Sequence, residues 1–125
     1  MFYFGILLAG GSGALLRYFL GRATIAMGWT ALPFGTLLAN IIGSFLIGYL
    51  SWALLHRWSL SSEMQTILIT GFLGGFTTFS AFSLDVIKLL EAGSTSRALI
   101  YVLASVLASI LMCFLGLALA RQASL

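Results

Sequence analysis

The feature that most constrains this chain is a run without charge over residues 64–84 that is interrupted by poor helix formers. The run is long enough to cross a bilayer, which takes about 20 residues of helix. Its centre holds Gly74 and Gly75, which cost about 1 kcal/mol each relative to alanine in a helix, followed by Thr77 and Thr78. A helix interrupted at membrane depth leaves backbone groups that lipid cannot satisfy. We therefore expect this break to face protein, water or an ion, as broken helices do at the binding sites of transport proteins.

The composition places the whole chain in a membrane. Of its 125 residues, 61% are hydrophobic and 7% are charged, and the mean hydropathy is +1.12, values typical of integral membrane proteins. The six basic and three acidic residues are scattered, so no basic patch for nucleic acid is present. Cys113 is the only cysteine, so it forms no disulfide within the chain. We expect a single four-helix membrane domain over residues 1–125.

The charged residues divide the chain into four apolar segments, each close to the length of a membrane-crossing helix. The predicted spans are Phe2–Leu20, Pro33–Leu55, Met64–Leu84 and Ala98–Ala120. Pro33 suits the first turn of the second span, and Ser62 with Gln65 matches a capping box at the start of the third. Basic residues follow the first span and none precedes it, the reverse of a signal peptide, so we expect this span to be retained.

Small residues recur at four-residue spacing in the first two spans. The first span has Gly5, Ala9 and Gly13, and the second has Gly35, Ala39 and Gly43. This spacing lets helix backbones approach closely in a membrane. We interpret both rows as surfaces where helices pack together. They indicate helix partners and give no information about a transported substrate.

Basic residues are almost evenly divided between the two sides of the membrane. With four spans, the side of the termini carries Arg57 and Arg121, and the other side carries Arg22, Lys88 and Arg97. Orientation follows an excess of Lys and Arg on the cytoplasmic side. The balance therefore predicts a chain that inserts both ways and pairs antiparallel. The alternative is a single orientation, fixed by the bias of one residue or by Arg17. Four short helices enclose no wide pore, so we expect an oligomer in either case.

Neutral polar residues form three sets within the spans. The sets are Asn40 and Ser44; Tyr101, Ser105 and Ser109; and Thr77, Thr78, Ser80 and Ser83 around the break. A single hydroxyl commonly bonds back to its own helix, and an amide joins neighbouring helices. Three sets together favour a polar pathway, in which Asn40 is the costliest side chain to bury. Phe76, Phe79 and Phe82 form either a packing stripe or a row of ring edges for a small anion.

Acidic and catalytic residue types are scarce. No carboxylate precedes Glu63, and Asp85 and Glu91 fall at the far end of the third span, near Lys88. Proton-coupled carriers need a titratable group at membrane depth, and small multidrug exporters place an essential glutamate in their first span. With one cysteine, one histidine and no paired acids, the sequence offers no nucleophile, metal set or acid/base pair. We do not expect an enzyme.

Three segments stand out in the sequence: GGSGALLRY at 10–18, GTLLANIIGSF at 35–45 and GFLGGFTTFSAFS at 71–83. In order and spacing, they resemble three signatures of the Fluc (CrcB) fluoride channels. The resemblance covers nearly the whole chain. Ala81 departs from the family pattern, in which threonine is usual between the two phenylalanines. This change removes one hydroxyl and leaves both rings in place.

The resemblance implies a passive fluoride channel in the bacterial inner membrane that lets cytoplasmic fluoride leave. It implies an antiparallel, dual-topology homodimer with two narrow pathways, and a third helix broken near its centre. The residues implied for the pathway are Phe79 and Phe82 as an aromatic box, Asn40 and Ser80 as donors, and Tyr101, Ser105 and Ser109 as a polar track.

The resemblance also implies a structural sodium ion on the dimer axis, held by the backbone carbonyls of Gly74 and Thr77 from both subunits. Carbonyl oxygens suit such a hard cation. Arg17 would belong either to an anion-attracting vestibule or to the structure of the helix end. The alternatives to a channel are a small dual-topology carrier of another substrate and, more distantly, a membrane scaffold that transports nothing.

Overall fold

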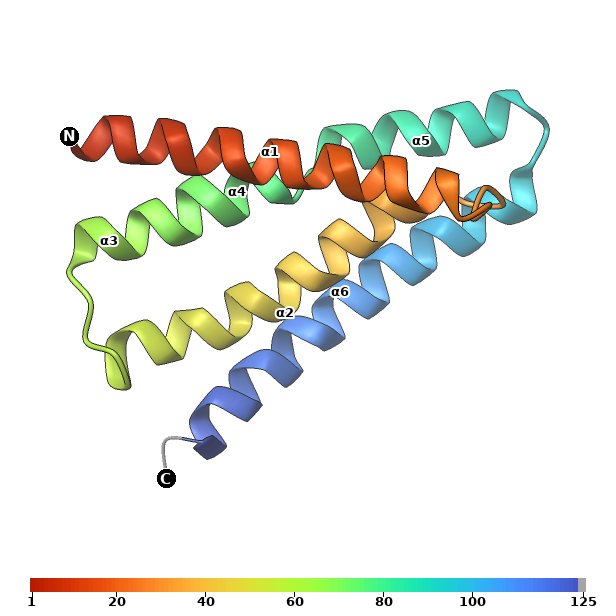
Figure 1. Cartoon of the computed structure of the whole chain (residues 1–125). Helices are drawn as coiled ribbons and strands as arrows, with labels where there is room; N and C mark the ends of the chain where they lie inside the picture. Colours follow the sequence, from red (N-terminus) through yellow and green to blue (C-terminus); the bar gives the residue numbers. More distant parts are fainter. Residues whose placement is uncertain (124–125) are drawn as a thin grey trace.

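The four apolar segments become helices, arranged as Figure 1 shows in a computed structural model that describes residues 1–123. The elements are α1 (Phe2–Ala26), α2 (Phe34–His56), α3 (Ser62–Thr66), the π-helix η1 (Ile67–Leu73), α4 (Gly74–Phe76), α5 (Phe79–Glu91) and α6 (Thr95–Ala123). No strand occurs within the described residues. The last two residues of the expected domain, 124 and 125, lie outside them.

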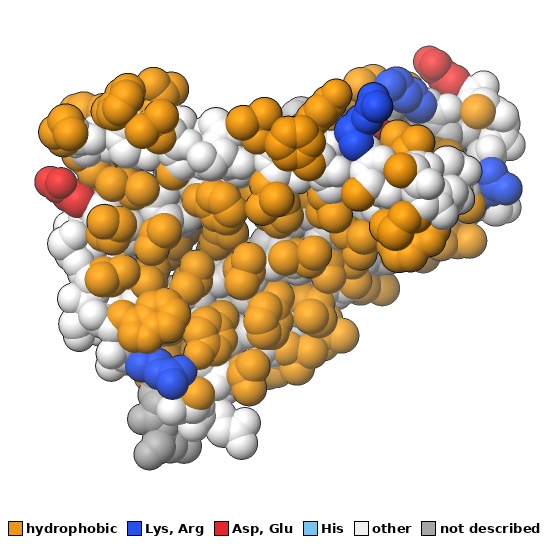
Figure 2. Space-filling view, in the orientation of Figure 1, with side chains coloured by type: hydrophobic (Ala, Val, Ile, Leu, Met, Phe, Trp, Pro, Cys, Tyr) orange, Lys and Arg blue, Asp and Glu red, His pale blue; other side chains and the backbone are white. Residues whose placement is uncertain are grey.

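The all-helical membrane class predicted from the sequence is confirmed. Four helical stretches, 2–26, 34–56, 62–91 and 95–123, are long and apolar enough to cross a membrane. Large apolar side chains remain exposed along them, as expected of surfaces that face lipid or a partner; examples are Leu7, Phe19, Leu107 and Phe114. Figure 2 shows the same distribution, with an apolar band between charged side chains at the two ends of the molecule.

The first helix continues to Ala26 and does not end at Leu20 as the sequence suggested. The expected end was placed before Arg22, but arginine is a good helix former and does not end a helix. Gly28 ends the helix instead, in a left-handed conformation at φ 80°. The N–H of Trp29 then reaches back to the carbonyl of Thr24 at 2.9 Å, which closes the last turn.

The start of the third span also differs from its prediction. Ser61, and not Ser62, is the N-cap, because its hydroxyl accepts the N–H of Met64 at 3.2 Å. A cap side chain serves the N–H three residues on, which fixes the cap at 61. Gln65 completes no capping box, since its Nε2 donates to the carbonyl of Leu60 at 2.8 Å. In α2, Pro33 is likewise the N-cap, one position before the first helical turn.

The helices pack as two joined layers. In one layer α1 lies along η1 and α4, and in the other α2 runs beside α6 (Figure 1). Both termini lie at the same end of the molecule as the α2–α3 connection, and the α1–α2 and α5–α6 connections lie at the opposite end. This is the arrangement expected of four successive membrane crossings.

Glycines set the distance between these helices, which confirms the packing interpretation of the small residues. A Cβ at Gly13 would run into the carbonyl of Phe72, and one at Gly43 would run into the side chain of Thr77. Gly75 is as tightly placed, because a Cβ there would overlap the carbonyl of Gly10. The third span thus lies against α1 with almost no side chain between the backbones.

We predict that Gly75→Ala destabilises the protein and that Gly11→Ala does not. The new methyl at 75 has to push α1 away from α4, which should cost about 1–3 kcal/mol of unfolding free energy. A Cβ at Gly11 would meet no atom within 4 Å, so this neighbour of Gly10 is the matched control. Thermal unfolding of the detergent-solubilised protein, followed by circular dichroism, compares the two variants. Equal midpoints would show that the contact at Gly75 does not limit stability.

Candidate functional site

Two residues without helical geometry separate α4 from α5. Thr77 has φ −85° and ψ 159°, and Thr78 has φ −157° and ψ 127°, so both are extended. β-Branched residues favour this conformation over a helical one. Each threonine also serves a helix end: the Thr77 hydroxyl donates to the carbonyl of Leu73 at 3.0 Å, and the Thr78 hydroxyl accepts the N–H of Ala81 at 3.1 Å.

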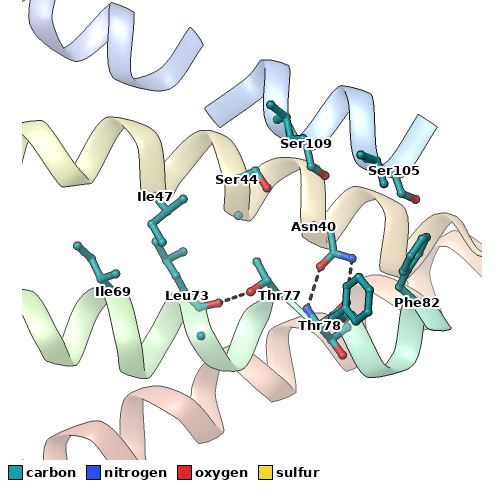
Figure 3. Close-up of a pocket in the computed structure, with 15 residues that line it drawn as sticks. Asn40, Ser44, Ile47, Ile69, Leu73, Thr77, Thr78, Phe82, Ser105 and Ser109 are labelled. Atoms are coloured by element: carbon teal, nitrogen blue, oxygen red, sulfur yellow. Dashed lines mark hydrogen bonds between the residues drawn. The ribbon is translucent and has the colours of Figure 1, made fainter. Parts of the chain in front are cut away.

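Asn40 of α2 satisfies the backbone of this extended pair. The N–H of Thr78 donates to Asn40 Oδ1 at 2.8 Å, and Asn40 Nδ2 donates to the carbonyl of Thr78 at 3.0 Å (Figure 3). The primary amide therefore acts as a short piece of partner strand, since it accepts from one backbone group and donates to the other. One of its two N–H bonds remains for another acceptor.

The extended residues Thr77 and Thr78 form the junction between α4 and α5. A cavity of about 470 Å³ lies beside this junction, between α2, the third span and α6 (Figure 3). Its polar lining consists of Asn40, Ser44, Thr77, Thr78, Ser105 and Ser109. The hydroxyls of Ser105 and Ser109 are buried and have no hydrogen-bond partner within residues 1–123. Buried hydroxyls are normally satisfied, so these two, one helical turn apart, are available to a ligand.

The three phenylalanines near the break divide into two groups. Phe79 and Phe82 both line the cavity, with ring centroids 5.5 Å apart and planes tilted by 52°. Phe79 is 78% exposed, whereas Phe82 is 8% exposed. Phe76 does not line the cavity: it is buried and stacks on Phe72 with centroids 6.2 Å apart. Phe76 is thus a packing residue in this structure.

The remaining candidate residues lie at different distances from the cavity. Gly74 and Thr77 line it, and Gly74 is exposed. Tyr101 is fully buried outside the lining and packs on Phe82, with centroids 5.2 Å apart. Ser80 is exposed outside the lining, with its hydroxyl 3.4 Å from that of Thr78. Arg17 lies apart from this group, beside a smaller cavity that shares no residue with the first.

Comparison with known proteins places the chain in a family. The family described as CrcB-like protein, Camphor Resistance (CrcB), matches residues 4–117. The chain belongs to the CrcB family. It is 53% identical over 119 residues to a protein of Rhizobium meliloti (strain 1021), a match that covers 93% of this chain and 95% of the relative.

Further relatives of this CrcB chain have similar lengths. One from Chelativorans sp. (strain BNC1) is 52% identical, with 94% of each chain covered. Another, from Rhizobium leguminosarum bv. trifolii (strain WSM2304), is 46% identical, with 93% of each covered. All three relatives are named fluoride-specific ion channel FluC, which is the name of a channel and not of an enzyme. The CrcB chain is a multi-pass membrane protein.

Sequence reasoning missed one contact of the CrcB chain. The hydroxyl of Tyr101 donates to Asp85 Oδ2 at 3.0 Å, which joins α6 to α5. From the sequence, Asp85 was placed at the far end of the third span, near Lys88, and no contact was expected for it. It follows Phe82 by three residues and therefore shares its helix face. That spacing was the signal that could have placed Asp85 against the same tyrosine.

In this CrcB chain we predict that Asn40→Ala lowers the unfolding free energy by about 1–3 kcal/mol, because it leaves the N–H of Thr78 without a partner and removes the Asn40 hydrogen bond to the carbonyl of Thr78. Ser44→Ala, one turn away on the same cavity wall, is the matched control and should leave stability unchanged. Chemical unfolding in detergent measures both variants. If Asn40→Ala is as stable as the control, the amide does not support the extended pair.

Proposed function

We propose that this protein is a passive, fluoride-selective channel of the bacterial inner membrane that exports cytoplasmic fluoride. In this proposal residues 1–125 form one four-helix membrane domain, and the third span is functionally broken at Thr77 and Thr78. The observation that carries the proposal is the cavity beside this break, which is lined by Ser105 and Ser109, whose buried hydroxyls have no partner within residues 1–123. We take fluoride as the transported ion because the relatives are named fluoride-specific ion channels.

The chemistry of the cavity suits a small anion. Fluoride is strongly hydrated, so it enters a narrow passage only where protein donors replace water. Ser105, Ser109 and the spare N–H of Asn40 are such donors. The rings of Phe79 and Phe82 carry a positive edge that attracts an anion without the desolvation cost of a full charge. A larger halide is held poorly by the same closely spaced groups.

Three residues join the pathway in supporting positions. We assign the buried Tyr101 to the polar track as the residue that orients Phe82, since the two rings are in contact. Ser80 lies at the exposed start of α5, where its hydroxyl extends the row of donors from Thr78. Arg17 lies away from the pathway cavity, where it serves either a vestibule or the end of α1.

A second copy of the chain, inserted in the opposite sense, would complete two pathways. The large ring of Phe79 and the backbone at Gly74 are exposed beside the cavity, although both lie deep within a membrane span. An antiparallel partner would cover them. The nearly even division of basic residues between the two ends of the molecule supports opposite insertion of the two copies.

A structural sodium ion on the dimer axis fits the backbone at the break. In a continuous helix the carbonyls of Gly74 and Thr77 would accept the N–H groups of Thr78 and Ala81. Those N–H groups donate to side chains instead, to Asn40 Oδ1 and to Thr78 Oγ1. Both carbonyls therefore lack their helical donors and are the kind of hard oxygen ligand that Na⁺ takes. The ion would fix the two breaks against each other.

The second candidate function is a small dual-topology carrier of another substrate. The sequence argued against a carrier because its spans hold few carboxylates. One observation favours a carrier: Asp85 is partly buried and hydrogen-bonded to Tyr101, so a carboxylate lies close to the candidate pathway. Carboxylates at such depth serve proton relays in carriers. Proton movement during transport therefore separates the two functions.

We predict fast fluoride efflux from proteoliposomes, measured with a fluoride-selective electrode, in the absence of a pH gradient. Phe79→Ile and Phe82→Ile keep apolar bulk but remove the ring quadrupole, so each should lower the flux about tenfold or more. The protein should still assemble, because isoleucine fills similar space. Phe76→Ile is the matched control and should conduct, since that ring packs away from the cavity.

Three outcomes would contradict parts of this proposal. Fluoride efflux coupled to proton movement would indicate a carrier. No fluoride movement at all would indicate a membrane scaffold that transports nothing. Unchanged flux in both cavity variants would assign Phe79 and Phe82 to packing. In the same assay, replacement of sodium by choline on both sides should reduce the flux of the wild-type protein; full flux without sodium would remove the structural ion from the proposal.

We also predict that the charge balance controls insertion. Lysines added after Arg121 should place every copy with its termini in the cytoplasm, and lysines added at 93–96 should bias insertion the other way. Each biased version alone should fail to support fluoride export, because it lacks an opposite partner. Co-expression of the two should restore export, as measured by growth of fluoride-sensitive cells.

The matched control for orientation is the same number of glutamines added at each position. Accessibility labelling of the termini reports orientation independently of function. A biased version that exports fluoride fully alone, with a single labelled orientation, would rule out the antiparallel dimer.

A further inference from the structure

Aromatic and basic side chains gather where α2 and α6 end, at the end of the molecule that also holds the two termini (Figure 1). We call them the α2–α6 end cluster, which consists of Tyr49, Trp52, His56, Arg57, Trp58 and Arg121. None of these residues lines the pathway cavity. The cluster therefore lies outside the site described above.

Each arginine of the cluster is held by a neutral aromatic side chain of α2. The Arg57 guanidinium donates from Nη1 to the Tyr49 hydroxyl at 2.7 Å. The Arg121 guanidinium lies over the Trp52 ring, with its Cζ 5.0 Å from the ring centroid. Tyr49 and Trp52 are three residues apart, so they share one face of the helix. The two rings thus bring arginines from the ends of two helices to the same part of the surface.

Further rings hold the two aromatic supports in place. The His56 ring stacks on Trp52, with centroids 3.8 Å apart and planes 14° apart. Tyr49 lies between two other rings, with its centroid 6.4 Å from that of Trp58 and 6.5 Å from that of Phe45. Groups that are already held in position lose less conformational freedom when a ligand binds. The supports therefore lower the entropic cost of binding at the two arginines.

The charges of the two guanidinium groups are not neutralised within residues 1–123. There Arg57 and Arg121 form no ion pair, and their guanidinium groups donate to no acceptor other than the Tyr49 hydroxyl. The acidic residue at this end is Glu63, which lies in the first turn of α3 and stabilises that helix start. A guanidinium group carries five N–H donors. Most donors of the pair are therefore available to an anion.

The cluster lies at the depth of lipid headgroups. Tryptophan and tyrosine are enriched at that level, and two of the three tryptophans of the chain, Trp52 and Trp58, are in the cluster. Arg121 lies near the end of α6 and is exposed. Closer to the middle of the membrane, the same helix exposes Leu115 and Leu119. A phosphate at the arginines would thus have apolar surface on the side where its acyl chains run.

We propose that the α2–α6 end cluster binds the headgroup of one acidic phospholipid per chain. The phosphate accepts hydrogen bonds from Arg57 and Arg121, and a guanidinium group can bond two phosphate oxygens at once. A headgroup with net negative charge is favoured over phosphatidylcholine, because choline would bring a further cation to two that have no counter-charge. Basic residues next to a membrane span attract anionic lipids for the same reason.

The exposure of the cluster favours a lipid over free phosphate. Both arginines are exposed, and salt screens the attraction between an exposed charge and a free anion. A phospholipid is held at this depth by its acyl chains, so its effective concentration at the cluster is high. The membrane therefore supplies the part of the affinity that an exposed pair of charges lacks.

The experiment measures the lipid that the protein retains from mixed nanodiscs of phosphatidylglycerol and phosphatidylcholine, by native mass spectrometry. The wild-type protein should retain phosphatidylglycerol in preference, one molecule per chain. Arg57→Lys and Arg121→Lys keep every charge, and so the charge balance that governs insertion, but lysine lacks the planar fork of arginine. Each variant should lower the retained ratio about threefold, and the double variant about tenfold. Arg97→Lys, in the first turn of α6 at the opposite end, is the matched control and should keep the wild-type ratio.

A second pair of variants tests the aromatic support without touching an arginine. Tyr49→Phe keeps the ring but removes the hydroxyl that holds Arg57. Retention of phosphatidylglycerol should fall about threefold, as expected for the loss of one hydrogen bond. Tyr3→Phe is the matched control, because Tyr3 is 83% exposed near the N-terminus, at the same end of the molecule, and holds neither arginine. This variant should retain the lipid.

Four results would overturn the proposal. The first is equal retention of the two lipids by the wild-type protein. The second is an unchanged ratio in the double lysine variant or in Tyr49→Phe, which would show that charge alone attracts the lipid. The third is an equal fall in Arg97→Lys. The fourth is loss of phosphatidylglycerol on addition of inorganic phosphate, which would make the cluster a site for the free anion. Fluoride efflux should stay at the wild-type level in all these variants, so the lipid site and the channel function are tested separately.

Discussion

The structure depends on the pair of hydrogen bonds between the Asn40 amide and the backbone of Thr78. A membrane provides no water to an interrupted helix, so an extended residue at that depth is tolerated only where protein supplies both a donor and an acceptor. A primary amide carries its donor and its acceptor on separate atoms, so it can bond the N–H and the carbonyl of one residue at the same time. Once Thr78 is held in this way, α5 can start at Phe79. The cavity lies beside this start, with the exposed ring of Phe79 in its wall.

The glycine contacts bring the rest of the structure to this junction. Gly13, Gly43 and Gly75 allow α1, α2 and the third span to approach until backbone meets backbone or side chain. The contact of Gly43 with Thr77 lies one turn from Asn40 on the same helix face, so the packing seam and the hydrogen-bonded residue position each other. A wider helix separation would move the Asn40 amide out of reach of Thr78. Close packing and polar satisfaction are therefore one requirement at this point.

The sequence predicted the four membrane-spanning helices because charge, hydropathy and helix propensity act locally. Asn40 and the two serines of α6 were also identified, since polar residues stand out in an apolar segment. The partner of Asn40 was not identifiable, because Thr78 accepts it through backbone atoms that any residue carries. The contact of Asp85 with Tyr101 likewise depends on how α5 leaves the junction. The end of α1 was misplaced because a charge was taken as a boundary, although only Gly28 ends the helix.

The π-helix Ile67–Leu73 has a consequence for how relatives of different length are compared. A π turn holds one residue more than an α turn, so a segment of this kind can lose a residue by tightening to an α-helix. The residues after it would keep their positions against α1 and α2. A one-residue deletion between 67 and 73 would therefore appear in an alignment as damage to a transmembrane helix, yet leave Gly74 and the junction in place. The third span can therefore lose one residue within its π-helix, directly before Gly74 and the extended residues Thr77 and Thr78.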